Sequence, residues 1–309
     1  MKCAGMIFKT VCLTCFLFNP LSVFSQGTYD GVEWNAAYLF KPVEIKRNLL
    51  LASDHNVYYG GFNDFGYIKN DSLGNVTPHS LHDEHRLDSL DYGNIWRSAE
   101  FKGSIFFQTT DYLFRYKLNT GNIEVIEADQ DFDQLLTLGE RMITRFEGKG
   151  FYEIDGDKFT EVEGSGLFSD DKVFSIENFE SHSLVFSREH GITEYINGRF
   201  TPVKNRASRL VSDFNIYRTT KLQDGRIAIA TLKGGVLIID ESGKLLNIID
   251  EEKGLSTNIV YDVFADSEST LWAALDNGLS RIYLNKPVTR IDEVCMRVQP
   301  KDFIRLKQI

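Results

Sequence analysis

One short β-rich run recurs six times along this chain, and this recurrence limits the possible folds more than any other feature. Successive copies begin 48, 37, 42, 43 and 44 residues apart. The copies are Val57-Tyr58-Tyr59-Gly60, Ile105-Phe106-Phe107-Gln108, Met142-Ile143-Thr144-Arg145, Leu184-Val185-Phe186-Ser187, Ile227-Ala228-Ile229-Ala230 and Leu271-Trp272-Ala273-Ala274. Repeats of about 40 residues are typical of arrays whose units bury their apolar faces against one another.

Each run is followed by a turn and by another strand with apolar residues at alternate positions. These following strands open at Gly66, Leu113, Gly150, Gly191, Gly235 and Gly278. Glycine there suits a tight connection with a positive φ. A second turn, such as Asp155-Gly156, then leads to a last strand, such as Ile123 to Ile126. Another apolar run, such as Ile95-Trp96, precedes each unit.

Four strands per unit, with no helical periodicity between them, predict an all-β fold: a β-propeller of four-stranded blades. The sequence supplies six full repeats plus a partial N-terminal strand segment, Tyr29 to Trp34. The ring therefore closes with six blades, or with seven if residues 288–309 pair with that segment, and we expect the two ends to meet in an irregular ring. A β-sandwich or a β-solenoid is the alternative, but a sandwich shows no regular period of this length and solenoid coils are shorter.

The first 25 residues have the features of a secretory signal peptide. Lys2 and Lys9 precede and flank the start of an apolar stretch from Val11 to Phe18, and a cleavage site lies near Ser25/Gln26. We therefore expect a periplasmic or secreted protein. An uncleaved anchor is the alternative, although this stretch is short for a hydrocarbon layer roughly 30 Å thick.

Removal of the leader would leave Cys295 as the single cysteine of the mature chain. Neither an internal disulfide nor a multi-cysteine metal site is then expected. A lipid anchor at Cys15 is a further alternative, although the preceding residues fit a lipoprotein cleavage box poorly. No later window is apolar over 18 residues, so we expect no membrane span in the mature chain. The formal net charge of -10 argues against direct nucleic-acid binding.

The last and first repeats carry a recognisable set of residues. They read Gly254-Leu255-Ser256, Val260-Tyr261-Asp262, Leu271-Trp272-Ala273 and Gly278-Leu279-Ser280-Arg281-Ile282 in the last, and Tyr59-Gly60-Gly61-Phe62-Asn63-Asp64-Phe65-Gly66-Tyr67 in the first. This set resembles the two-component regulator propeller family. It is most similar to the periplasmic sensor region of Bacteroidetes-type regulators, which continue into a triple-tyrosine module, one membrane span and a LuxR-like helix-turn-helix or a histidine kinase. The resemblance covers roughly Thr28 to Pro287 and is weaker for the copies at Met142 and Leu184.

This resemblance implies a domain organisation and a function. A signal peptide would occupy residues 1–25, a sensor propeller 26–287, and a C-terminal strand or tail 288–309, which closes the ring or begins another blade. The chain stops at Ile309, before any triple-tyrosine module, so we expect a sensor that lacks its transmitter. The implied stimulus is an oligosaccharide, and the implied partner is the triple-tyrosine, transmembrane transmitter module.

The sequence contains no motif of a reactive centre. Asp266 begins a near-match to the Asp-box of sialidases, but Glu268 stands where that motif needs glycine. No Gly-x-Ser-x-Gly elbow, Walker loop or dinucleotide fingerprint is present. We therefore predict a protein without catalytic residues and without a cofactor.

Two groups of residues have spacings that metal sites use. His79, His82 and His85 are spaced by three, but Pro78 and polar neighbours favour a loop there. Asp129, Asp131 and Asp133 alternate as in some calcium loops, yet the glycine and the distal glutamate of an EF-hand are missing. We predict no metal site, and we place the acidic pairs Asp170-Asp171 and Glu251-Glu252 in surface loops.

The polar loops at one end of the propeller are the candidate ligand site. The loops that lead into the innermost strands share this end with the turns between second and third strands, around the mouth of the axis. The candidate ligand-binding residues are Asn63, Asp64, Asp91, Tyr92, Asp111, Lys149, His190, Asn215, Lys233, Asn258, Asp276 and Asn277. Their amides, carboxylates and aromatic ring could bind hydroxyl groups or a neighbouring domain, although hairpin tips are polar in any such fold.

Three functions remain open from the sequence. The first is a non-catalytic periplasmic sensor or interaction propeller in a two-component-like system that controls transcription. The second is a stand-alone secreted scaffold that binds an envelope protein. The third, disfavoured by the missing motifs, is a secreted hydrolase or lyase acting on a polysaccharide. Trp34, Trp96 and Trp272 are expected to pack between blades in all three cases.

Overall fold

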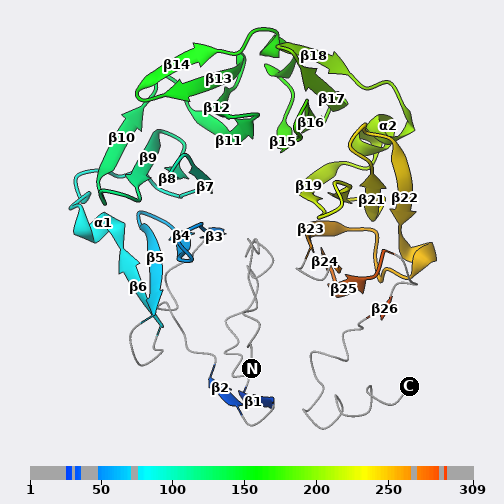
Figure 1. Cartoon of the computed structure of the whole chain (residues 1–309), viewed down its shortest axis with the longest axis horizontal. Coiled ribbons are helices and arrows are strands. Elements are labelled where there is room, and N and C mark those ends of the chain that lie inside the picture. The colour runs from blue at the N-terminus through cyan, green and yellow to red at the C-terminus, as the bar shows by residue number, and fades with distance from the viewer. Residues whose placement is uncertain are drawn as a thin grey trace.

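The computed structural model describes residues 26–29, 32–35, 48–70, 76–265, 270–284 and 289–290. These residues form six four-stranded antiparallel sheets, which are the blades of a six-bladed β-propeller (Figure 1). In every blade, consecutive strands are neighbours in the sheet, and the innermost strand comes first in the chain. The sequence prediction of an all-β propeller is confirmed.

Each of the six blades consists of four strands that are consecutive in the chain. The first three blades are β3 (Asn48–Leu51), β4 (Val57–Gly60), β5 (Phe65–Asn70) and β6 (Val76–Ser80); β7 (Arg97–Phe101), β8 (Ser104–Gln108), β9 (Tyr112–Lys117) and β10 (Ile123–Glu127); and β11 (Phe132–Leu138), β12 (Arg141–Phe146), β13 (Gly150–Asp155) and β14 (Lys158–Glu161). The last three are β15 (Val173–Asn178), β16 (Ser183–Ser187), β17 (Gly191–Ile196) and β18 (Arg199–Pro202); β19 (Ile216–Lys221), β20 (Ile227–Thr231), β21 (Val236–Ile239) and β22 (Leu245–Ile249); and β23 (Val260–Ala265), β24 (Leu271–Leu275), β25 (Gly278–Ile282) and β26 (Thr289–Arg290).

All six recurrent runs of the sequence are second strands of blades, as their spacing predicts. The innermost strand of the second blade begins at Arg97, so Ile95 and Trp96 lie in the loop before it rather than in a strand. Ile95 is buried under the first blade, whereas Trp96 is 47% exposed. The expectation that Trp96 packs between blades is therefore wrong. Trp272 is half-buried and lies against Arg281, while the side chain of Trp34 lies outside the described residues.

The described strands near the two ends of the chain do not pair with each other to form a seventh blade. A hairpin of β1 (Gln26–Tyr29) and β2 (Val32–Asn35) forms a separate two-stranded sheet. The strand β26 pairs with β25 and completes the sixth blade, so this blade extends beyond the boundary that we expected at residue 287. Residues 1–25, which include the predicted signal peptide and its cysteines, and Cys295 lie outside the described residues.

Short helices interrupt the strand pattern in the connections between blades. They are α1 (Leu81–Glu84), α2 (Arg206–Asp213) and the 3-10 turns η2 (Ser165–Phe168) and η3 (Glu251–Lys253). The Asn205 side chain caps α2 by accepting a hydrogen bond from the amide of Ser208 at 2.9 Å. Ala207 and Val211 of this helix are buried in the core. Within the described residues, no helix is long and apolar enough to cross a membrane.

The hydrophobic core lies between blades, because each strand sends alternate side chains to opposite neighbours. On β20, Ile227 and Ile229 pack toward the fourth blade, whereas Ala228 and Ala230 pack toward the sixth. All four side chains are completely buried. A single blade would leave both of these faces in water, so the ring is the unit of stability.

Polar side chains on the innermost strands also connect successive blades. Ser98 donates to the amide oxygen of Asn48 at 2.6 Å, between the second and first blades. Asn178 donates to the carbonyl of Thr137 at 3.1 Å, between the fourth and third. Thr219 donates to Ser175 at 2.7 Å, between the fifth and fourth. These hydrogen bonds hold the inner strands in fixed positions around the axis.

Candidate ligand-binding face

One end of the propeller collects two sets of loops, which we call the axial face. The turns between second and third strands are residues 61–64, 109–111, 147–149, 188–190, 232–235 and 276–277. The connections between blades are residues 81–96, 128–131, 162–172, 203–215 and 250–259. Because adjacent strands are antiparallel, both sets lie at the same end of each sheet. All twelve candidate residues from the sequence belong to these loops, and the structure shows how each is used.

Asn63 and Asp91 join the first blade to the connection that follows it. The Asn63 amide donates to the Asp91 carboxylate at 2.9 Å and accepts from the backbone amide of Gly93 at 2.6 Å. Asp64, beside Asn63, accepts a hydrogen bond from Ser80 at 2.7 Å. These side chains therefore fix loop geometry, and Asp91 remains exposed while it does so.

Tyr92 lies in the core and not on the surface of the axial face. Its ring packs against Phe65 and Phe114, with centroid distances of 5.8 and 4.8 Å. Its hydroxyl is 2.8 Å from Nδ1 of His82. Burial raises the pKa of Tyr92 above its ordinary value. The ring that sequence analysis placed among the ligand-binding groups thus stabilises the interface between the first and second blades.

His190 is held by a buried carboxylate. Its Nδ1 is 2.8 Å from Oδ2 of Asp171, and the backbone amides of Glu189 and His190 donate to the same carboxylate at 2.8 and 3.1 Å. Asp171 is only 3% exposed, so the expectation that it lies in a solvated surface loop is wrong. Burial alone would raise the pKa of Asp171, but the hydrogen bonds that its carboxylate accepts from Glu189 and His190 hold it below the ordinary value.

This arrangement gives a pH-dependent prediction. Because the pKa of Asp171 is depressed on folding, its ionised form stabilises the fold above the unfolded pKa, and the stabilisation is lost as the pH falls through the folded pKa. We expect Asp171→Asn to lower the free energy of unfolding by about 2 kcal/mol at pH 7. The difference from wild type should shrink below about pH 4. Chemical denaturation at several pH values measures both.

Asp170→Asn is the matched control, because the neighbouring Asp170 is exposed and accepts a single side-chain hydrogen bond, from Ser169 at 3.1 Å. It should change stability by less than about 0.5 kcal/mol. An Asp171→Asn effect of equal size at pH 7 and pH 3 would contradict the role given to the ionised carboxylate.

The loops of the fifth and sixth blades are also linked to one another. Asn258 accepts from the amide of Glu251 at 2.9 Å, and its carbonyl accepts from Gly235 at 3.0 Å. The Asn277 side chain accepts from Ser256 at 2.6 Å. Asp276 accepts from the Tyr261 hydroxyl at 3.0 Å, and the carbonyl of Asn215 accepts from the amide of Leu232 at 3.0 Å. Loop-to-loop bonding is thus general on the axial face.

Three candidate residues project from the hydrogen-bonded loops of the axial face into solvent. The side chains of Asp111, Lys149 and Lys233 are exposed. Within the part of the chain that the structure describes, these three side chains make no hydrogen bond or ion pair. They carry charges of both signs and come from the second, third and fifth blades. They are the candidate residues best placed to meet a ligand without breaking an existing contact.

The histidine and aspartate groups with metal-like spacing do not converge. His79 lies on β6 and binds Glu84 at 2.8 Å, whereas His82 lies in α1 and binds Tyr92. The expectation of a loop at this place is wrong, because Ser80 caps α1 by accepting from the amide of Asp83 at 3.1 Å. Asp133 pairs with Arg145. Among the described residues, no three His, Cys, Asp or Glu side chains are grouped as a metal site.

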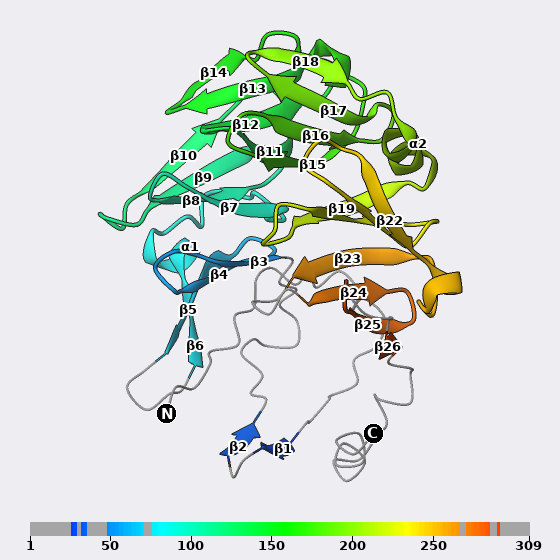
Figure 2. The same cartoon turned by 45° about the vertical axis from the view of Figure 1, so that its right-hand side comes forward.

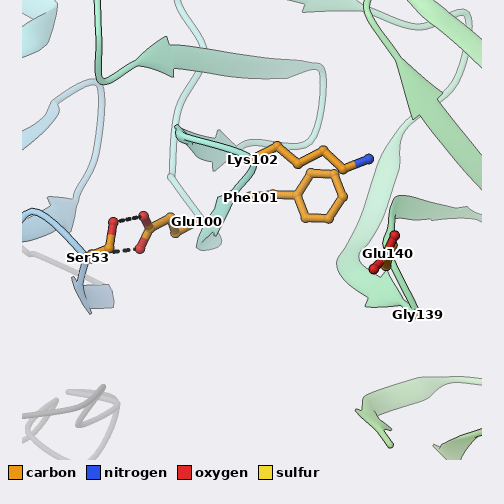
Figure 3. Close-up of a pocket in the computed structure, with 6 residues that line it drawn as sticks. All are labelled: Ser53, Glu100, Phe101, Lys102, Gly139 and Glu140. Carbon is orange, nitrogen blue, oxygen red and sulfur yellow. Dashed lines mark hydrogen bonds between the residues drawn. The ribbon is translucent and has the colours of Figure 1, made fainter. Parts of the chain in front are cut away.

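A hollow of about 580 Å³ lies at the opposite end of the blades (Figure 3). Its lining comes from the end of β7 and from the turns between first and second strands: Ser53, Glu100, Phe101, Lys102, Gly139 and Glu140. The amide of Ser53 donates to Glu100 at 2.8 Å, and the Lys102 ammonium lies 4.9 Å from the centre of the Phe101 ring. Sequence analysis named none of these residues. The hollow is open to solvent, and one of its two carboxylates, Glu100, already accepts hydrogen bonds from Ser53.

Sequence reasoning also missed two exposed aromatic side chains on the axial face. Phe62 is 61% exposed and Trp96 is 47% exposed. Phe62 follows a Gly-Gly pair in a turn between strands, which was a usable signal because such turns are exposed. Trp96 gave no comparable signal, since its exposure depends on where the innermost strand begins.

No protein-family profile and no curated protein matches the chain. Among solved structures, the WD40 β-propeller domain of Doa1 is similar with a TM-score of 0.59 and 14% identity, over 84% of this chain and 85% of that one. Virginiamycin B lyase from Staphylococcus aureus has a TM-score of 0.59 and 12% identity, over 82% and 84%. The extracellular domain of a protein described as a hybrid two-component system of B. thetaiotaomicron has a TM-score of 0.41 and 14% identity, over 87% and 41%. The first two likenesses show the β-propeller fold, and at these identities they assign no activity to this chain.

Proposed function

We propose that this chain is a non-catalytic recognition propeller, the extracytoplasmic sensor of a two-component-like signalling system. The observation that carries the proposal is the use of polar groups on the axial face. Asn63, Asp171 and Asn258 bind neighbouring loops, while Asp111 and Lys149 project into solvent. A rigid frame with a few projecting groups suits binding, because little conformational entropy is lost when a ligand meets it.

The surroundings of His190 support a binding role over a catalytic one. An imidazole oriented by a carboxylate has the geometry of a general base. The nearby hydroxyls, however, donate to main-chain carbonyls: Ser208 to His190 at 3.2 Å and Ser212 to Arg188 at 2.7 Å. A hydroxyl nucleophile would need to donate to the imidazole instead. The Asp171–His190 pair therefore acts to hold the loop in place.

The ligand and partner classes come from the family resemblance of the sequence. We propose an oligosaccharide as the ligand, bound by the projecting side chains and the amides of the axial face. A triple-tyrosine, transmembrane module that passes the signal to a histidine kinase or a transcription regulator would be the partner. The predicted signal peptide supports a location outside the cytoplasm.

Isothermal titration calorimetry of the mature chain against a panel of oligosaccharides tests this function. We expect heat of binding with at least one member of the panel. The Lys149→Ala, Lys233→Ala double variant should bind that member about tenfold more weakly, since each ammonium donates to ligand oxygens. Glu140→Gln, in the hollow at the other end, is the control and should bind normally. An absence of heat with every member, or a loss confined to the control, would contradict the proposal.

A further inference from the structure

Phe62 and Trp96 form an exposed aromatic pair on the axial face. Phe62 forms an isolated antiparallel bridge with Asn94. Around this bridge, the backbone amide of Ile95 donates to the carbonyl of Gly61 at 2.8 Å, and the backbone amide of Asn63 donates to the carbonyl of Gly93 at 2.7 Å. The two segments thus run side by side as a short ribbon. Ile95 is fully buried on its inner side, and Phe62 and Trp96 remain exposed.

The indole of Trp96 is fixed in orientation although half of it is exposed. Its Nε1 donates to Oγ1 of Thr110 at 3.1 Å, and its backbone amide donates to the carbonyl of Gln108 at 2.7 Å. Large aromatic groups held in this way lose little entropy on binding, and they dominate the affinity of many protein interfaces.

Exposed carboxylates lie in the loop that carries Trp96 and in the next two axial-face loops along the chain. They are Asp88, Asp91, Asp111, Asp129 and Asp131. Several contacts hold these loops together: Asp91 binds Asn63, Thr110, next to Asp111, binds the indole, and the Thr110 carbonyl accepts from the amide of Phe132 at 2.7 Å. In these loops the exposed cation is Arg86, so this sector of the axial face carries a strong negative charge.

The sector on the other side of the ring has a different character. Its loops expose Lys172, Arg188, Lys233 and Lys253 among their acidic residues. The combination of exposed aromatic rings with charge of one sign is therefore confined to the loops of the first two blades and the connection to the third, since Lys149 is exposed on the turn that follows. A local field of one sign steers ligands of the opposite charge to the surface that carries it.

We propose that Phe62, Trp96 and these five carboxylates form a docking surface for a basic segment of a partner protein. An arginine or lysine side chain of the partner lies against the Trp96 indole, where cation–π attraction adds to the pull of the carboxylates. The surface shares Asp111 with the proposed oligosaccharide site but does not include its lysines, and the proposal does not depend on that function. A neutral sugar would also stack on an aromatic ring and donate hydrogen bonds to carboxylates, but it would gain nothing from the net negative charge of the surface.

Fluorescence anisotropy with labelled peptides tests the surface on the full mature chain. The probes are a twelve-residue Gly/Ser peptide that carries four arginines and the same peptide with four glutamates. We expect binding of the arginine peptide alone, weakened at least fivefold between 50 and 300 mM NaCl because salt screens the carboxylates. Trp96→Ala should weaken binding about tenfold, and Trp96→Phe should retain part of the affinity. Asp111→Asn should lower the affinity and reduce its dependence on salt.

Leu279→Ala is the matched control, because Leu279 is 51% exposed on β25 of the sixth blade, away from this surface. It should bind the arginine peptide like wild type, and the thermal midpoints of all variants should confirm that they are folded. Equal binding of the two peptides, or unchanged affinity in Trp96→Ala, would overturn the proposal. Salt-independent binding of a neutral oligosaccharide that Trp96→Ala abolishes would overturn it too, and would identify the surface as a sugar site.

Discussion

Replacement of Arg145 by alanine is expected to lower the free energy of unfolding by about 3 kcal/mol. Arg145 lies on β12 and is only 4% exposed. Its guanidinium donates to the carbonyls of Phe168 and Ser169 at 2.9 Å each and pairs with Asp133. The variant would remove the side-chain donor of the Phe168 carbonyl and of the Asp133 carboxylate and leave the Ser169 carbonyl with the Gly148 amide alone. It would also loosen the connection between the third and fourth blades.

Two further variants distinguish the contribution of the Arg145 hydrogen bonds from that of a positive charge alone. Arg145→Lys should recover only part of the loss, since an ammonium lacks the planar fork that reaches all three acceptors. Arg226→Ala removes an exposed pair with Asp224, 2.6 Å apart, and should cost less than about 1 kcal/mol. Denaturant titrations of the three proteins measure the differences. Equal losses in Arg145→Ala and Arg226→Ala would show that the buried contacts add nothing.

Gly191→Ala is expected to destabilise the protein by about 2 to 4 kcal/mol. Gly191 opens β17 with a φ of 66°, in the left-handed region that favours glycine. A Cβ atom there would lie 2.1 Å from the carbonyl oxygen of Ser208 in α2. This oxygen belongs to the backbone of a capped helix, so it cannot move without disturbing the interface between the fourth and fifth blades.

Gly198→Ala distinguishes the clash from the backbone strain. Gly198 has a φ of 79°, but a Cβ atom would have no neighbour within 4 Å. This control should cost only about 1 kcal/mol. Thermal and chemical unfolding of both variants gives the comparison, and a Gly191→Ala loss no larger than that of Gly198→Ala would show that α2 yields to the added methyl group.

The sequence was sufficient to predict the blades because each one repeats the same local signals. Alternating apolar residues and turn glycines mark a second and third strand in every copy, and these signals depend little on the rest of the chain. The short helices were missed for the opposite reason. The helix α2 depends on the Asn205 cap and on the burial of Ala207 and Val211 between blades, and a tertiary contact of this kind has no periodicity in eight residues.

The candidate site was predicted at the level of loops but not of side chains. The topology alone places the twelve residues at one end of the propeller. Whether a polar group projects or binds a neighbouring loop depends on contacts between segments far apart in the sequence, as between Asp171 and His190. Tyr92 lies in the core because its ring packs against Phe65 and Phe114. No sequence pattern near Tyr92 indicates that these two distant residues leave space for it.

The uneven side chains of β20 have a consequence for how such a chain can evolve. Ile227 and Ile229 need a neighbour with one shape, and Ala228 and Ala230 need a neighbour with another. Although all six blades have the same four-stranded architecture, the side chains of each blade are complementary in size to those of its two neighbouring blades. Duplicating or reordering a blade would place isoleucine against isoleucine or leave alanine facing a void. The sizes of the side chains at the interfaces therefore determine the order of the blades.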